Sequence, residues 1–252
     1  MRKNEFKIGC FIISLSILSV IAACGLPTAY SVHSANDQTL SLNLNRNNLG
    51  EIPPQVFQMT QLRVLRVNRN QIKTIPPEIG NLVNLEKIYL GKNEIKTLPP
   101  EIGQLKQLKI LSAPYNDIEH LPDEIGELDN LEQLMLDQNE LKRFPNAIGK
   151  MKNLKTLTAS FNQIETIQPE LFESGSIEEI NFSYNLIDTI PYSIGNLYNL
   201  HQLILVNAGY LLILPESLCK LRRMDRIEID RSIQLPRCLL VRRPPQLQII
   251  YR

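Results

Sequence analysis

The sequence repeats itself every 23 residues over most of its length. The segment "QIKTIPPEIGNL" (71–82) returns as "EIKTLPPEIGQL" (94–105), with the same residue types at nearly every place. A single short copy cannot bury its own apolar face, so such a period predicts a solenoid in which stacked coils share one core. Full copies begin at Thr39, Leu62, Leu85, Leu108, Leu131, Leu154, Ile177 and Leu200, the last with one extra residue, and a truncated ninth begins at Met224.

Each position of a copy has a physical reason, as Leu85–Lys106 illustrates. Apolar residues at positions 4 and 6 alternate with outward positions 3, 5 and 7, which predicts a short strand with one buried face. Proline at position 15 fixes φ before a short helical or extended turn, and the glycine of that turn stands where a positive φ is allowed. Position 9 is asparagine, whose buried amide is expected to satisfy backbone groups beyond the strand: Asn47, Asn70, Asn93, Asn116, Asn139, Asn162 and Asn185.

The first 23 residues predict an export signal rather than part of the fold. A basic start, "MRKNEFK", precedes 16 uncharged residues (8–23), too few for a comfortable membrane span. They end in "IAAC", which resembles the bacterial lipobox, whose cysteine, here Cys24, carries the lipid anchor. Residues 24–38 would then be a tether, and the protein an exported lipoprotein of the outer membrane or cell surface. The alternative is an ordinary signal peptide cut after "AYS" (29–31), giving a periplasmic or secreted protein.

The repeats resemble the leucine-rich-repeat family, in its short bacterial form with "LPxxIGxL" segments. Together with the lipobox they are similar to leucine-rich-repeat lipoproteins of spirochaetes. The family implies a right-handed α/β solenoid with a parallel sheet on its concave side and short 3-10, helical or extended turns on its convex side. The solenoid is expected over 39–232, with nine strands.

Residues 233–252 leave the repeat pattern and are expected to cap the core. The alternative is a basic, apolar strip that contacts a membrane through Arg237, Arg242, Arg243 and Arg252. After export and lipidation, Cys219 and Cys238 remain, and an even pair in an oxidising compartment predicts a disulfide near this end. Two unpaired buried thiols are the alternative.

The sequence contains little that could support catalysis. The three histidines, His33, His120 and His201, stand in unrelated places, and no metal-binding spacing, phosphate loop or acyl-transfer motif is present. The position-17 glutamates belong to solvated turns: Glu78, Glu101, Glu124 and Glu170. A net charge of +1 without a basic tract argues against nucleic acid. We therefore expect neither enzyme activity nor a cofactor or metal.

The outward strand positions are where a partner could bind. Position 2 alternates in sign, which predicts cross-strand pairs with a structural role: Arg63, Glu86, Lys109, Glu132, Lys155 and Glu178. Position 8 instead stacks cations and then aromatic residues, the side chains that dominate protein interfaces. The predicted partner-binding residues are Arg46, Arg66, Arg69, Lys87, Tyr89, Lys92, Tyr115, Met135, Phe161 and Tyr184.

Three functions remain open at this point. The favoured one is recognition of a protein through the concave face, such as a host surface or matrix protein if the anchor displays the solenoid outside the cell. A second is a structural scaffold in the cell envelope, and a third is glycan binding through Tyr89, Tyr115 and Tyr184. For the aromatics of position 8, the alternative is that they only cover the asparagine turns.

Overall fold

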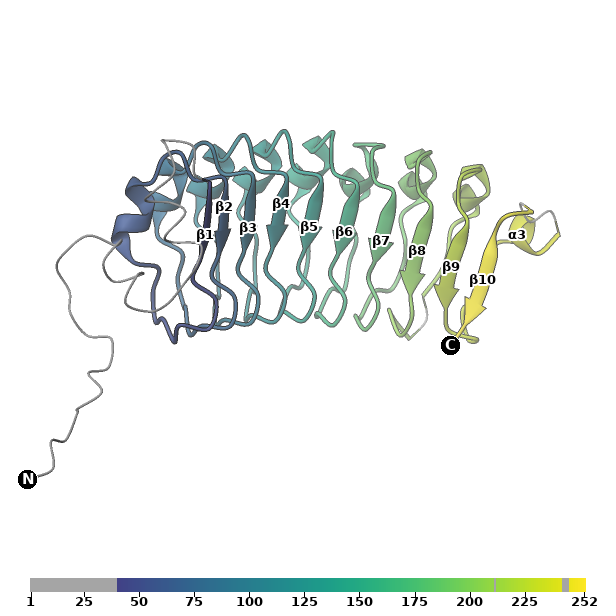
Figure 1. Ribbon diagram of the computed structural model, residues 1–252. Helices are drawn as coiled ribbons and strands as arrows, with labels where there is room; N and C mark the ends of the chain where they lie inside the picture. The colour runs from purple at the N-terminus through teal and green to yellow at the C-terminus, as the bar shows by residue number, and fades with distance from the viewer. Residues whose placement is uncertain (1–39, 211, 242–244) are drawn as a thin grey trace, which may run out of the picture.

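A computed structural model describes residues 40–210, 212–241 and 245–252. The predicted signal, Cys24 and the tether lie outside these ranges, as do Arg242 and Arg243. The described chain forms one open, curved sheet of ten parallel strands in sequence order, with 3-10 turns on its other side (Figure 1). The predicted solenoid is confirmed.

The strands are short and follow the repeat. Each position-4 residue pairs with its counterpart in the next coil, as Leu65 does with Ile88, and both are fully buried. The extra residue of the eighth copy shifts the register, so that Leu203 pairs with Ile227. The strands are β1 (Ser41–Asn43), β2 (Val64–Arg66), β3 (Lys87–Tyr89), β4 (Ile110–Ser112), β5 (Gln133–Met135), β6 (Thr156–Thr158), β7 (Glu179–Asn181), β8 (Gln202–Leu205), β9 (Arg226–Ile229) and β10 (Gln248–Tyr251).

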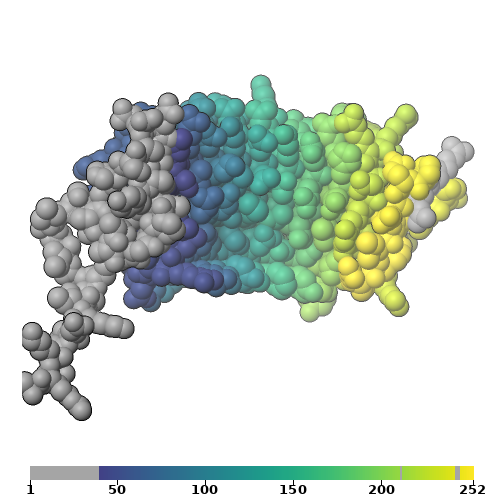
Figure 2. Space-filling model, viewed as in Figure 1, coloured from purple at the N-terminus to yellow at the C-terminus, as the bar shows by residue number. Residues whose placement is uncertain are grey.

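The convex side consists of one 3-10 turn per coil. Pro99 illustrates how they begin, because its φ of −74° and ψ of 153° are extended and the turn starts at the next residue. Ile102 and Leu105 then point into the core and are fully buried. The coils pack into a continuous body (Figure 2). The turns are η1 (Pro54–Gln58), η2 (Pro77–Asn81), η3 (Pro100–Gln104), η4 (Asp123–Glu127), η5 (Asn146–Lys150), η6 (Pro169–Phe172), η7 (Tyr192–Asn196) and η8 (Glu216–Lys220).

The glycine of the convex turn has a different role from the one predicted. A positive φ was expected, but Gly175 is the glycine with positive φ in the described chain, and it lies outside the 3-10 turns. At Gly103 an added Cβ would lie 2.5 Å from the carbonyl oxygen of Glu124 in the next coil. That is far inside van der Waals contact, so glycine is required because adjacent coils approach closely on this side.

The position-9 asparagines join each coil to the one before it. Asn116 donates from Nδ2 to the carbonyls of Leu90 (3.1 Å) and Ala113 (3.1 Å), and its Oδ1 accepts from the amide of Ile95 (3.1 Å). The same three kinds of bond recur at Asn70, Asn93, Asn139, Asn162 and Asn185. The Nδ2 atom of Asn47 has no partner in the described chain, which begins with this coil.

The C-terminal segment adds a strand to the nine predicted. Ile249 of β10 pairs with Ile227, and the helix α3 (Arg237–Val241) precedes it. A Cys219–Cys238 disulfide joins α3 to η8, with the two Cα atoms 6.0 Å apart. The segment therefore continues the sheet beyond β9.

A buried carboxylate anchors this added strand. Glu228 is almost fully buried on β9 and pairs with Arg226 and, at 3.2 Å, with Arg252. Arg252, one of the residues suggested for a membrane strip, thus has a partner inside the protein.

The alternating charges of position 2 pair across the strands. Glu86 accepts from Lys109 (3.0 Å) and Arg63 (3.3 Å), and Lys155 donates to Glu132 (3.0 Å). The hydrogen bond from Lys109 lowers the pKa of Glu86, against a smaller opposing effect of desolvation. The hydrogen bond to Glu132 raises the pKa of Lys155. Because these pairs are exposed to water, they fix neighbouring strands in register more than they stabilise the fold.

We predict that Asn116→Ala lowers the free energy of unfolding by about 2–4 kcal/mol, because three buried backbone groups lose their partner. Urea denaturation followed by circular dichroism measures the change. Asn130→Ala is the matched control, since Asn130 is exposed and makes one bond, to the carbonyl of Lys106 (2.8 Å). The control should lose less than about 1 kcal/mol. Equal losses in both variants would show that the asparagine amides do not hold the coils together.

Candidate functional site

The position-8 residues share a backbone conformation that is rare for side chains other than glycine. Each has a φ between 51° and 60°, in the left-handed region. This conformation costs roughly 1–2 kcal/mol for an L-residue, so the surrounding structure must impose it. We call these residues the position-8 row: Arg46, Arg69, Lys92, Tyr115, Gln138, Phe161, Tyr184 and Asn207.

Backbone hydrogen bonds hold the row in place. The amide of Lys92 donates to the carbonyl of Pro114 (2.8 Å) in the next coil, and the amide of Tyr115 donates to that of Asp137 (2.9 Å). The bond recurs from coil to coil, from Arg46 to Tyr184. The row therefore lies along the edge where the strands end, with its side chains outward and its amides already occupied.

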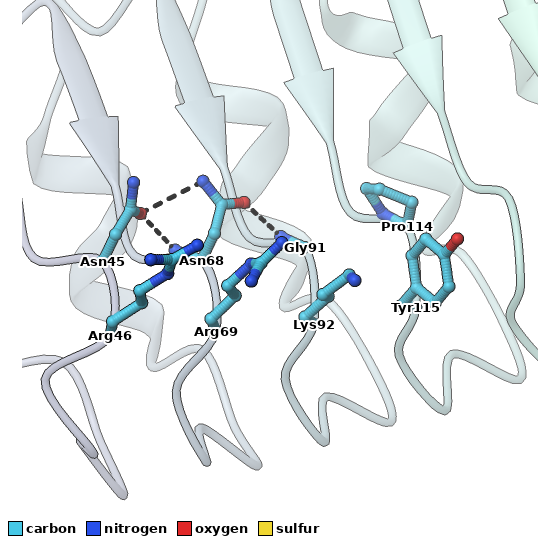
Figure 3. A pocket seen from close by; sticks show the side chains of 8 residues that line it. All are labelled: Asn45, Arg46, Asn68, Arg69, Gly91, Lys92, Pro114 and Tyr115. Atoms are coloured by element: carbon cyan, nitrogen blue, oxygen red, sulfur yellow. Dashed lines mark hydrogen bonds between the residues drawn. The ribbon is translucent and has the colours of Figure 1, made fainter.

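The first four members of the row line a shallow pocket of about 350 Å³ with the position-7 residues beside them (Figure 3). Asn45 accepts from the backbone amide of Asn68 (2.7 Å), and Asn68 accepts from the amide of Gly91 (2.7 Å). The acceptor oxygens of these asparagines are thus turned toward the neighbouring coil. The lining residues are Asn45, Arg46, Asn68, Arg69, Gly91, Lys92, Pro114 and Tyr115, none of them acidic.

This end of the row carries uncompensated positive charge. Arg46 and Arg69 form no ion pair within the described ranges, and the Lys92 ammonium lies 4.6 Å from the centroid of the Tyr115 ring. The nearest acid along positions 7 and 8 is Asp137, whose carboxylate accepts from the Ser160 amide (2.9 Å) and hydroxyl (2.6 Å). Three cations on neighbouring coils, about 4.8 Å apart, favour an anionic ligand.

The other end of the row is aromatic. The rings of Phe161 and Tyr184 stack with centroids 4.1 Å apart and planes 8° from parallel. They are 47% and 43% exposed, so stacking covers one face and leaves an apolar surface open to water. The rings therefore do more than cover the asparagine turns.

The apolar surface near this end contains residues that the sequence analysis missed. Leu186 (48% exposed), Tyr210 (96%) and Ile213 (64%) belong to the loops that follow the strands of coils seven and eight. A signal was available, because position 10 is polar in copies two to six and Leu186 replaces that polar residue in copy seven.

The remaining predicted residues lie on the strands. Arg66 donates to the Ser41 hydroxyl (2.9 Å), and its guanidinium carbon lies 5.1 Å from the centroid of the Tyr89 ring. Lys87 lies beside them on β3, and Met135 lies on β5 between the cationic and aromatic groups. The structure thus groups the cations with Tyr89 and Tyr115 and places Phe161 and Tyr184 in a second group.

One cluster in the described chain has metal-ligand residue types, namely Glu216, Cys219 and Cys238. Its two sulfurs form the disulfide, so they are not available as thiolate ligands. His201 lies 3.5 Å from Asp225 in the position-2 ladder, apart from the row.

Comparison with known proteins defines the family. A family model described as a leucine-rich repeat region matches residues 40–179, more than half of the chain. The chain belongs to the leucine-rich-repeat family. No curated protein matches it significantly. Among solved structures, a leucine-rich-repeat protein of Leptospira interrogans is similar, with 27% identity, a TM-score of 0.72 and coverage of 88% of this chain. The spirochaete resemblance agrees with this match, although the chain spans only 63% of that protein.

Other leucine-rich-repeat structures share the fold. A plant peptide hormone receptor, RGFR1, solved in complex with RGF2, has 26% identity and a TM-score of 0.74 over 86% of this chain and 36% of the receptor. An internalin of Listeria monocytogenes has 22% identity and a TM-score of 0.73 over 89% of this chain and 63% of its own, which shows the common fold.

We predict that Gln138→Gly leaves stability unchanged or raises it by up to about 1 kcal/mol, because glycine adopts a φ of 55° without a steric penalty. Gln138→Val should lower the free energy of unfolding by more than about 1 kcal/mol, since a β-branched residue tolerates this conformation least. Thermal denaturation of both variants tests the pair. A valine variant as stable as the glycine variant would contradict the assigned backbone conformation.

Proposed function

We propose that this protein is an exported, lipid-anchored binding module that recognises a protein partner through the position-8 row and the adjoining concave face. The observation that carries the proposal is that consecutive coils keep large side chains where glycine would relieve backbone strain. Strain retained in this way is characteristic of functional surfaces. Core and convex residues are committed to packing, so recognition falls to the row.

The chemistry of the row fits a protein ligand. Unpaired guanidinium groups at one end and open aromatic faces at the other are the groups that form interface hot spots. The family relative RGFR1 was solved with a bound partner, RGF2, and this supports the same mode of use here. The short cationic end, confined to three coils, suits a protein with its own charge pattern better than a long polyanion.

Export is supported by the disulfide and the N-terminal sequence. A disulfide such as Cys219–Cys238 is typical of proteins outside the reducing cytosol. Within the described ranges, no helix is both long and apolar enough to span a bilayer. On this proposal, the lipid on Cys24 attaches the solenoid to the membrane.

Cys24→Ala is expected to abolish labelling with radioactive palmitate and to move the protein from the membrane fraction to the soluble fraction. Cys10→Ala is the matched control, because that cysteine lies within the apolar run of the signal, and its labelling should persist. Persistent labelling of the Cys24 variant would refute the lipid anchor.

If the anchor displays the solenoid outside the cell, the partner is a host surface or matrix protein. The alternative is a scaffold that binds other envelope proteins in the periplasm. Protease treatment of intact cells separates the two locations, since a fully protected solenoid rules out the host-directed version.

Arg46→Glu combined with Arg69→Glu is expected to abolish capture of the protein partner in cross-linked pull-downs from intact cells. Both side chains are exposed, so the thermal transition should move little. Lys150→Glu combined with Lys152→Glu makes the same change in net charge around the convex turn η5 and should retain capture. Unchanged capture by the first variant would exclude the cationic end from the binding site.

A further inference from the structure

We infer that the position-8 row binds an extended segment of the partner, with acidic side chains at one end and an apolar or aromatic side chain at the other. This inference rests on the proposed function and specifies the chemistry of the ligand. It follows from the order of the row, which changes from cationic in coils one to three to aromatic in coils six and seven.

The cationic end selects carboxylates. The planar guanidinium groups of Arg46 and Arg69 can each bind a carboxylate through two hydrogen bonds, and Lys92 adds a third positive charge. The rest of the pocket lining is uncharged, and its asparagine oxygens accept bonds from the neighbouring coil. Two or three neighbouring acidic side chains would therefore neutralise the whole end of the row.

The aromatic end selects an apolar side chain. The stacked rings of Phe161 and Tyr184 present about half of their surface to water, and Leu186 next to Tyr184's asparagine adds aliphatic surface. An apolar side chain placed here removes this surface from water, which is favourable by about 25 cal/mol per Å². No cation of the row lies at this end to attract an acid.

The separation of the two ends sets the spacing in the ligand. From Lys92 to Phe161 the row advances three coils, or about 14 Å at 4.8 Å per strand. An extended chain rises about 3.3 Å per residue, so roughly four residues separate the last acidic residue from the apolar one. Gln138, midway along the row, offers an amide to the intervening backbone of the ligand.

The backbone of the row cannot pair with the ligand as an added strand would. The amides of Lys92 and Tyr115 already donate to the next coil, and the strands on either side are paired. Recognition must therefore depend on side chains and on their spacing. This makes spacing the property to test.

The test uses fluorescent peptides with an Asp-Glu-Asp group, a Gly-Ser spacer of one to eight residues and a Phe-Leu pair, titrated against the full-length protein in detergent. Fluorescence anisotropy should give the tightest binding near a spacer of four, with about tenfold weaker binding at one and eight. Higher salt should weaken binding, because the cationic end is exposed. An affinity independent of the spacer, or no binding by any of these peptides, would overturn the inference.

Variants assign each half of the peptide to its end of the row. Arg69→Glu should remove the contribution of the acidic group, so that the peptide binds no better than one with Asn-Gln-Asn in its place. Phe161→Ser should remove the contribution of Phe-Leu and keep that of the acidic group. Contributions that persist in both variants would overturn the inference.

The inference and the proposed function fail in different ways. If protein capture depends on Arg46 and Arg69 but the peptides show no dependence on spacer length, the extended segment is wrong and the binding module stands. If capture is also insensitive to these arginines, both are wrong.

Discussion

The solenoid depends on one side-chain amide per coil. Asn116 satisfies two carbonyls and one amide that the strands cannot pair, and two of its three bonds reach the preceding coil. The chain can turn directly after a three-residue strand because this amide replaces the lost backbone partners. The left-handed residue immediately before each asparagine is part of the same turn. The device that closes the coil thus also projects the position-8 side chain outward.

The molecule separates what repeats from what varies. Leu98, Ile102 and Leu105 recur in kind because each fills the same place in a shared core. The prolines recur because every coil must turn at the same place. The row is free to change from Arg46 to Tyr184 because its conformation is imposed by the backbone and its side chains face water. A rigid scaffold therefore presents a variable line of side chains at a fixed spacing.

The sequence predicts the elements that depend on local pattern. Strand positions, inward residues and the asparagine bonds follow from alternation and from the chemistry of a buried amide. The role of Gly103 did not follow, because it depends on the distance to Glu124, which is set by the packing of two coils. Strand β10 was missed because its register with β9 differs from the 23-residue step and α3 interrupts the pattern. The stacking of Phe161 on Tyr184 joins side chains 23 residues apart, and only the three-dimensional arrangement reveals it.

The central claim is that the row is fixed before any partner binds. Hydrogen exchange of the backbone amides of Arg69, Lys92 and Tyr115 in the unbound protein tests it directly, because each donates to the next coil. Rigid coils predict that these amides exchange as slowly as the amides of β3 and β4. Exchange at the rate of an unstructured peptide would contradict the account, because a mobile row cannot hold cationic and aromatic groups at a defined spacing.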